Sequence, residues 1–254
     1  MININKRRPE SIQESMYSFP YHYLPYEDNE VWRISRQLWW GYDYLAVMDV
    51  VLHLTLQHDP QRVLDFGCGD GRLTYELAQR GINEVYGVDI SERALSFARA
   101  MNLDSHGIVH FGTNVEELPD AIFDVAVAME VLEHIPPEDL RAALANIHRV
   151  IRDTGVFIIT VPTKNVPLHP KHYRHFSVSD FEQAVQGFFT IKELSFVRKM
   201  GWLDGWIRRI VINQFFTMNW RPLLRLLTAL YKSHVMEADE SNGSHLVAVL
   251  RKQI

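Results

Sequence analysis

The stretch "VLDFGCGDGRLTYELA", residues 63–78, decides the fold. It begins as a short apolar run that reaches an acidic residue, Asp65, and it ends with the apolar spacing of a helix. Between the two lie Gly67, Gly69 and Gly71. Glycine permits a tight turn and a close approach of ligand to main chain, and the free N–H groups at the start of a helix suit polar or anionic groups. The stretch therefore predicts a strand, a ligand-binding turn and a helix.

The spacing of these glycines argues against a dinucleotide site. A dinucleotide fingerprint reads G-x-G-x-x-G, which would require glycine at position 72, where this chain has Arg72. The chain has an acidic residue followed by G-x-G-x-G. This pattern resembles the first motif of class I S-adenosylmethionine-dependent methyltransferases. A dinucleotide needs room for a pyrophosphate, whereas the sulfonium amino acid that the resemblance implies presents an ammonium group and a carboxylate, and a nearby aspartate suits the ammonium group.

Around this stretch, short β-branched runs alternate with amphipathic helical patterns, which is typical of an α/β fold with a parallel sheet. We expect strands at residues 62–66, 84–88, 107–111, 123–128, 156–161, 189–196 and 244–250. We expect helices at residues 72–80, 92–100, 137–151 and 180–188. The third helix includes Pro137 as a first-turn residue, and either Ser177 or Ser179 can cap the fourth.

Two segments lie outside this alternation and divide the chain into three parts. Residues 1–50 are rich in tyrosine and tryptophan and are interpreted as a helical arm, in which Tyr21, Tyr23 and Tyr26 either wall a substrate pocket or fasten the arm to the sheet. Residues 198–244 contain two amphipathic helical patterns. The predicted core is therefore residues 51–197 together with 245–254.

Three further motifs follow the glycine turn in a fixed order. Asp89 and Ile90 end the second strand, Asn114 and Val115 follow the third in "FGTNVEELP", and the fourth strand leaves through "MEVLEHI" from Met129. Together the four motifs resemble those of class I S-adenosylmethionine-dependent methyltransferases, of the type 11/12-like kind and similar to ubiquinone-biosynthesis O-methyltransferases. The resemblance implies a Rossmann-like seven-stranded sheet with an N-terminal helical arm and a helical insertion before the last strand, and S-adenosylmethionine as the cofactor.

The resemblance also implies which residues bind this cofactor. The Asp89 carboxylate would accept hydrogen bonds from both ribose hydroxyls. Asn114 stands where the family usually has aspartate, but an amide carbonyl can still accept from the adenine amine. The residues expected to bind the cofactor are Asp65, Gly67, Cys68, Gly69, Asp89, Ile90, Asn114, Val115, Met129 and Glu130.

Methyl transfer from a sulfonium is an in-line displacement, so positioning accounts for most of the acceleration. A nitrogen acceptor has only to arrive unprotonated, whereas a hydroxyl acceptor needs a base. His134 lies at the carboxyl end of the fourth strand, where open α/β sheets bind ligands. His172 and His175, in the histidine-rich loop "HPKHYRHFS", are expected to face the same crevice. These three histidines are the predicted catalytic residues.

The pattern E-x-x-E-H formed by Glu130, Glu133 and His134 has a second interpretation. It resembles the magnesium site of ubiquinone-pathway O-methyltransferases and the metal site of small-RNA terminal 2′-O-methyltransferases. One helical turn would bring the three side chains to one face, as a metal requires. An acid–base or structural use is favoured, and Mg²⁺ binding remains the alternative.

Composition limits the choice of partner. The net charge of −5 argues against nucleic acid, but residues 198–235 hold seven basic residues and one acid. The helical patterns of residues 202–231 are interpreted as a lid, a homodimer face or a peripheral membrane contact that presents a lipid-linked acceptor. Without a signal peptide or an apolar run of membrane-spanning length, the expected location is cytoplasmic, with membrane association as an option.

These observations predict an enzyme, a methyltransferase that acts on oxygen of a small or lipid-linked molecule such as a saccharide, a quinone precursor or a natural product. N-methylation of an amino sugar and metal-dependent RNA 2′-O-methylation are the alternatives within the class. A cofactor-binding scaffold without catalysis is the alternative outside it.

Overall fold

The structure, a computed structural model, describes residues 26–28, 31–33, 41–211 and 220–253. It divides into two units, residues 1–38 and 39–254. In the first unit, strands β1 (Tyr26–Asp28) and β2 (Val31–Arg33) form an antiparallel hairpin. The side chains of Tyr21, Tyr23 and Tyr26, predicted to wall a pocket or fasten the arm, lie outside the described residues.

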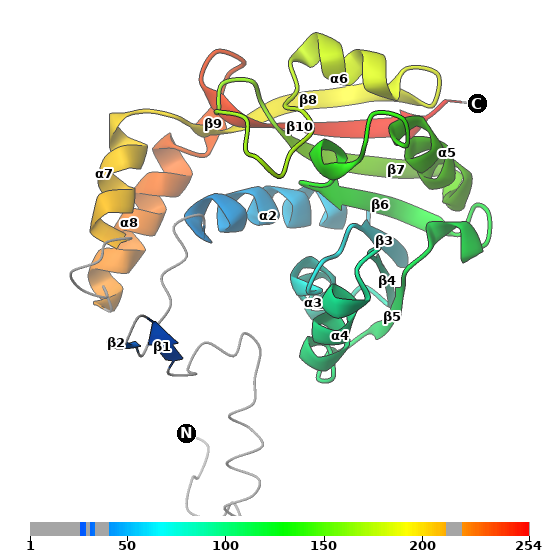
Figure 1. The fold of residues 1–254 in the computed structure, drawn as a ribbon, viewed down its shortest axis with the longest axis horizontal. Coiled ribbons are helices and arrows are strands. Elements are labelled where there is room, and N and C mark those ends of the chain that lie inside the picture. Colours follow the sequence, from blue (N-terminus) through cyan, green and yellow to red (C-terminus); the bar gives the residue numbers. More distant parts are fainter. Residues whose placement is uncertain (1–25, 29–30, 34–40, 212–219, 254) are drawn as a thin grey trace, which may run out of the picture. The chain divides into compact units, whose positions relative to one another are not determined.

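An eight-stranded sheet of order β5-β4-β3-β6-β7-β10-β8-β9 forms the centre of the second unit (Figure 1). Strands β3 to β7 are parallel to one another, and β10 is antiparallel to both β7 and β8. The strands are β3 (Arg62–Phe66), β4 (Glu84–Val88), β5 (Ile108–Gly112), β6 (Phe123–Met129), β7 (Ile151–Pro162), β8 (Phe189–Lys199), β9 (Glu237–Ala238) and β10 (Gly243–Lys252). The seven predicted strands are confirmed, and the two-residue strand β9 extends the sheet at one edge.

Helices cover both faces of the sheet. The described helices are α2 (Gly41–Leu56), α3 (Arg72–Gln79), α4 (Glu92–Met101), α5 (Leu140–Val150), α6 (Val178–Val185), α7 (Trp202–Val211) and α8 (Arg221–His234), with 3₁₀ turns η2 (Val115–Glu117) and η3 (Leu132–His134). Helix α5 starts three residues later than predicted, because Asp139 is its N-cap and the preceding prolines remain in the loop. Ser177, not Ser179, caps α6 in a capping box with Asp180.

Alternating side chains of the central strands form two apolar cores. On β6, Val125 and Val127 pack with α2 and α3, whereas Ala126 and Ala128 face α5 and α6. This alternation is the two-residue period of a strand buried on both faces. The small alanines leave room for the larger side chains of α5, such as Leu144.

Helix α2 joins the sheet to the helical pair α7–α8. It crosses residue 50, the predicted end of the arm, and buries Val47, Met48, Val51 and Leu52 against the sheet. Its Ala46 packs with α7 and α8, whose contact with each other is seen in Figure 1. None of the described helices has both the length and the apolar character to cross a membrane.

We expect Leu144→Ala to destabilise the second unit by about 2 to 5 kcal/mol, because the side chain is fully buried and its removal leaves a cavity. The matched control is Leu103→Ala, whose side chain is 83% exposed and which should shift the free energy of unfolding by less than about 0.5 kcal/mol. Urea denaturation of both variants measures the difference. Equal effects would contradict the core described above.

Candidate active site

The glycine turn lies between the end of β3 and α3, and its geometry requires glycine at two positions. Gly67 has a φ of 78°, and a Cβ there would lie 2.5 Å from the Val131 side chain. Gly71 also has a φ of 78°, and a Cβ there would lie 2.8 Å from that of Ala98. At Gly69, with a φ of 55°, a Cβ would meet nothing within 4 Å. The middle of the turn is therefore open, as a ligand lying against the main chain requires.

Asp89 fastens the end of β4 to this turn. Its carboxylate accepts hydrogen bonds from the backbone N–H groups of Gly69 and Ser91, both at 2.9 Å. Each carboxylate oxygen has a second acceptor site, so Asp89 can still accept from two hydroxyl groups. The neighbouring Ile90 is 94% exposed, which offers an apolar wall for a flat ring beside those acceptors.

Asp65 is a buried acid directly beneath the turn. One carboxylate oxygen accepts a hydrogen bond of 2.6 Å from the Thr74 hydroxyl on α3. Burial raises the pKa of Asp65 to about 7. A cation placed beside it would reverse this effect, because an opposite charge favours the ionised form. The site therefore suits a ligand with an ammonium group.

The other predicted cofactor residues have mainly structural contacts. Cys68 is buried, and its N–H donates to the Val88 carbonyl at 3.1 Å, so the main chain of Cys68 shapes the turn. The side-chain amide oxygen of Asn114 accepts a hydrogen bond from the Glu116 N–H at 2.9 Å and so caps η2. This oxygen can accept one further hydrogen bond. Val115 is buried below it, and Met129 is half-buried at the end of β6.

Glu130 leaves β6 in a strained conformation. Its φ is 57°, which is uncommon for a residue other than glycine. Its carboxylate accepts a hydrogen bond of 2.9 Å from the Thr160 hydroxyl and lies 3.3 Å from His245 Nε2. Burial disfavours the charged form of both Glu130 and His245. Their mutual attraction outweighs this effect, so the pKa of Glu130 is lowered and that of His245 is raised. Glu130 is thus held as a carboxylate by β7 and β10.

Hydrogen bonds arrange the imidazoles of the histidine-rich loop in a defined order. His175 Nδ1 lies 3.1 Å from the Val166 carbonyl, so it must donate, and its Nε2 can then only accept from His172 Nδ1 at 2.9 Å. His134 Nδ1 likewise donates to the Lys171 carbonyl at 3.2 Å. In the neutral rings, the Nε2 atoms of His134 and His172 therefore both carry lone pairs.

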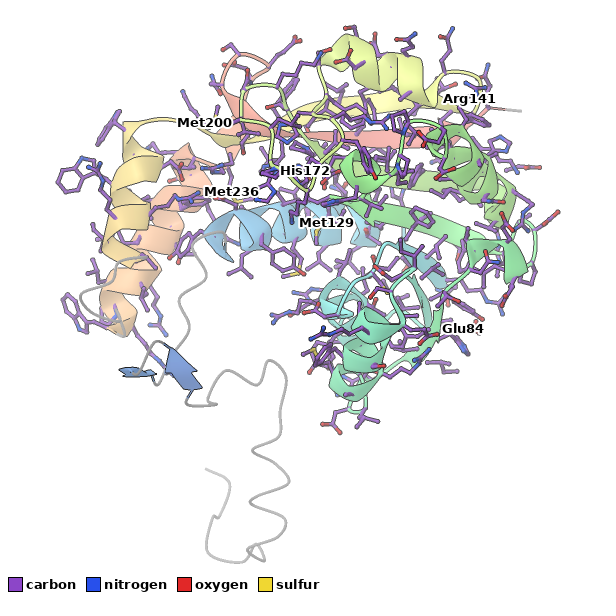
Figure 2. All side chains as sticks on the ribbon, in the orientation of Figure 1. Glu84, Met129, Arg141, His172, Met200 and Met236 are labelled. Atoms are coloured by element: carbon purple, nitrogen blue, oxygen red, sulfur yellow. The ribbon has the colours of Figure 1, made fainter. Side chains whose placement is uncertain are left out.

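These two lone-pair atoms belong to rings that lie close together. The ring centroids of His134 and His172 are 4.6 Å apart. Burial lowers the pKa of His134, and burial with the charge of His134 lowers the pKa of His172 to about 4. Figure 2 shows His172 on the loop after β7 and Met129 at the end of β6. The fold brings His134, His172 and His175 together through these ring contacts, and their catalytic use stays a prediction.

Glu133 lies against this cluster in an unusual environment. Both of its carboxylate oxygens are buried and have no hydrogen-bond partner among the described residues, and one is 3.8 Å from His134 Nε2. Burial and the nearby charge of Glu130 raise the pKa of Glu133. One ligand atom each from Glu133, His134 and His172 lies within 4.8 Å of the others, which fits a cation.

The donor set of this group differs from the predicted one. Thr160 and His245 hold Glu130 away from it, and His172 takes its place. Two imidazoles and one carboxylate suit a transition-metal ion better than Mg²⁺, which prefers oxygen ligands.

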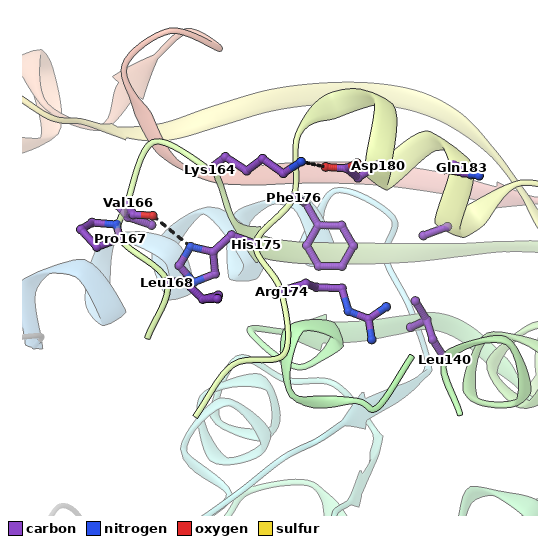
Figure 3. Close-up of a pocket in the computed structure, with 11 residues that line it drawn as sticks. Leu140, Lys164, Val166, Pro167, Leu168, Arg174, His175, Phe176, Asp180 and Gln183 are labelled. Carbon is purple, nitrogen blue, oxygen red and sulfur yellow. Dashed lines mark hydrogen bonds and ion pairs between the residues drawn. The ribbon is translucent and has the colours of Figure 1, made fainter. Parts of the chain in front are cut away.

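A pocket of about 710 Å³ lies beside the histidine-rich loop, between α5 and α6 (Figure 3). His175 forms part of its wall, and Lys164 at its rim is paired with Asp180 at 2.6 Å. Arg174 also lines it and donates to the Ile135 carbonyl at 2.8 Å. Among the described residues, no acidic side chain forms an ion pair with Arg174.

Three residues near the site were not predicted from the sequence. Thr160 and His245 position Glu130, and Tyr44 on α2 lies close enough to Asp65 and Asp70 for their charges to raise its pKa, after the larger effect of burial. All three come from elements far from the motifs along the chain. A polar residue inside an apolar strand, as at Thr160 and His245, is the signal that could have pointed to two of them.

Comparison with known proteins is consistent with this geometry. A family model described as a methyltransferase domain matches residues 39–196. A ubiquinone biosynthesis O-methyltransferase of Pseudomonas aeruginosa is 35% identical over 50% of this chain and 53% of its own length. A ubiquinone biosynthesis O-methyltransferase of Alkalilimnicola ehrlichii is 32% identical over 64% of this chain and 66% of its own. The chain thus spans between about half and two thirds of these curated relatives.

Solved structures show the same fold. The structural alignment with a Burkholderia thailandensis 1,6-didemethyltoxoflavin-N1-methyltransferase, solved with bound S-adenosylhomocysteine, covers 84% of this chain and 81% of that protein. Its TM-score is 0.55 and the sequence identity is 24%. An S-adenosylmethionine-dependent methyltransferase from Archaeoglobus fulgidus covers 83% of this chain and 94% of its own, with a TM-score of 0.56 and 17% identity.

We expect Asp65→Asn to change how stability depends on pH. Between about pH 4 and pH 7 the folded protein keeps Asp65 protonated while the unfolded chain ionises it, so wild-type stability falls as pH rises. Asparagine stays neutral and can still accept from Thr74. The variant should therefore gain about 2 to 4 kcal/mol relative to wild type over this range.

Urea denaturation at pH 4, 5.5 and 7 measures this gain, and Asp104→Asn, in an exposed loop, is the control. Parallel pH profiles of the wild type and Asp65→Asn would contradict a buried, protonated Asp65.

Proposed function

The chain belongs to the methyltransferase domain family, and we propose that it transfers a methyl group from S-adenosylmethionine to a hydroxyl oxygen on a small or lipid-linked molecule. The names of the curated relatives support oxygen as the acceptor and a phenolic quinone precursor as the acceptor class. Saccharides and natural products with an acidic hydroxyl belong to the same chemistry.

The observation that carries this proposal is the cluster of neutral imidazoles at the exit of β6. A hydroxyl acceptor must lose its proton as the new C–O bond forms, and His134 Nε2 carries a lone pair that can take it. The cofactor supplies the methyl group and leaves as S-adenosylhomocysteine. An amine acceptor would need no such base, so the cluster favours oxygen over the nitrogen of an amino sugar.

The neighbouring histidines have positioning roles in this account. His175 uses both ring nitrogens in hydrogen bonds and so orients His172. His172 packs edge-on to His134, and with Lys171 it fixes the direction of that ring. The lowered pKa of His134 keeps the ring neutral near pH 7, the form in which it accepts a proton.

A second role for the same cluster is favoured by the unpartnered carboxylate of Glu133. Glu133, His134 and His172 would hold a divalent cation, which would lower the pKa of a bound hydroxyl without a base. His134 Nε2 has a single lone pair, so it cannot bind a cation and accept a proton at the same time. They lead to opposite results when metal is removed.

We expect His134→Ala to lower kcat for methyl transfer to catechol by about 10² to 10⁴, because the general base is lost. The wild-type pH–rate profile should have its acidic limb below 6.5, since the pKa of His134 is lowered and the ring stays neutral until that pH is passed. Labelled S-adenosylmethionine measures the transfer. His106→Ala, at an exposed position, is the matched control.

An undiminished rate in His134→Ala would contradict the base assignment. Label found on the nitrogen of an amino sugar, with none on catechol or other hydroxyl acceptors, would contradict oxygen as the acceptor.

For the cation, we expect methyl transfer to survive dialysis against EDTA, because the neutral base needs no metal. Electron paramagnetic resonance of added Mn²⁺ supplies a readout independent of activity. Loss of activity with EDTA, its recovery with Mn²⁺, and Mn²⁺ binding abolished in Glu133→Gln would together assign the cluster to a cation instead.

A further inference from the structure

Helices α7 and α8 each have a buried face and an outward face. On the buried side, Ile207, Leu227 and Tyr231 pack with Ala46 of α2. Arg208 is fastened to Asp43 of α2 by contacts of 2.6 and 2.9 Å. Most of the apolar stripe in both helices is therefore buried within the protein. A binding partner would contact the opposite, exposed faces of α7 and α8.

The outward face of α7 carries large aromatic side chains. Trp202 is 78% exposed and Trp206 is 58% exposed, and Arg209 follows them at a spacing of i, i+4, i+7. Trp220, just before α8, is 65% exposed. Exposed tryptophan in such number is unusual for a surface that meets only water, because the indole ring is among the largest apolar side chains.

The outward face of α8 is basic. Arg221, Arg225 and Lys232 line a shallow groove of about 560 Å³ together with Thr228 and Ala229. Lys232 is paired with Asp49 at 2.7 Å. Among the described residues, no acidic side chain forms an ion pair with Arg221 or Arg225. The face thus presents two unpaired cationic side chains.

Exposed indole rings on α7 and, on the adjoining helix α8, arginines without an acidic partner among the described residues match the chemistry of one partner in particular. Tryptophan prefers the boundary between lipid headgroups and acyl chains, and basic side chains bind anionic headgroups. We propose that the outward faces of α7 and α8 form a docking surface for a bilayer of anionic phospholipid. A second copy of this chain would have to bring its own arginines against these, and like charges repel.

The docking surface also explains a feature of the fold. The Asp43–Arg208 contacts and the shared apolar cluster hold α7 and α8 to α2, and α2 lies on the central sheet. A bilayer bound there would be held at a constant position relative to the site. A lipid-linked acceptor would then arrive beside a fixed enzyme.

Co-sedimentation with vesicles tests the proposal without cofactor or acceptor, so its failure is separate from failure of the proposed function. The full chain should bind vesicles of phosphatidylglycerol and phosphatidylcholine and not vesicles of phosphatidylcholine alone. Arg221→Gln with Arg225→Gln should lower the partition coefficient about 25-fold, since each charge contributes about fivefold. Trp202→Ala with Trp206→Ala should lower it at least as much.

The matched controls are Arg93→Gln and Phe97→Ala on α4, both exposed, which should leave vesicle binding unchanged. Far-ultraviolet circular dichroism and sedimentation velocity monitor folding and oligomeric state. Absence of binding to the anionic vesicles, or equal losses in the control variants, would overturn the proposal. So would a dimer that the tryptophan variants dissociate while vesicle binding is unchanged.

Discussion

The contact between Gly67 and Val131 is the constraint on which the rest of the site depends. Any side chain at Gly67 would overlap Val131, which directly follows Glu130 at the exit of β6. The glycine turn and the loop that carries His134 are therefore in close contact. Because parallel strands end at one edge of the sheet, this contact places the proposed cofactor turn and the proposed base, His134, at the same edge. The contact excludes a Cβ at Gly67, and the φ of 78° there is a second reason for glycine in the first motif.

The charges of the site are divided between its two sides. Asp65 and Asp89 provide two carboxyl groups on the side of the glycine turn, which suit the ammonium group and the ribose hydroxyls of the proposed cofactor. On the other side, burial keeps His134 and His172 neutral and able to accept a proton. Glu130, at the exit of β6, is held as a carboxylate by His245 and Thr160. In the proposed mechanism, this arrangement would separate binding of the cationic cofactor from removal of the acceptor's proton.

Local motifs were enough to predict most of the fold. Strands β3 and β4 have the predicted bounds because each is a short apolar run ended by a turn residue. The start of α5 was predicted too early, since two prolines resemble a helix start but here remain in the loop. The partner of Glu130 could not be predicted, because His245 comes from the last strand and only the antiparallel insertion of β10 beside β7 brings it near. Sequence spacing grouped Glu130 with Glu133 and His134, whereas the fold replaced it with His172.

The packing of α7 and α8 likewise depends on contacts with a distant element that the sequence pattern does not reveal. Helical spacing identifies an apolar stripe but does not say what covers it. Here α2 covers that stripe, and the exposed tryptophans and arginines are what remain for a partner. The division of the helices into a buried face and an outward face thus required the structure.

We propose that the glycine turn at the carboxyl ends of β3 and β4 binds S-adenosylmethionine. Calorimetric titration of S-adenosylhomocysteine into the protein, with Asp89→Ala in parallel, tests it most directly. The account predicts one site per chain in the wild type and a large loss of affinity in the variant. Absence of binding to the folded wild-type protein, or equal affinity in the variant, would contradict it.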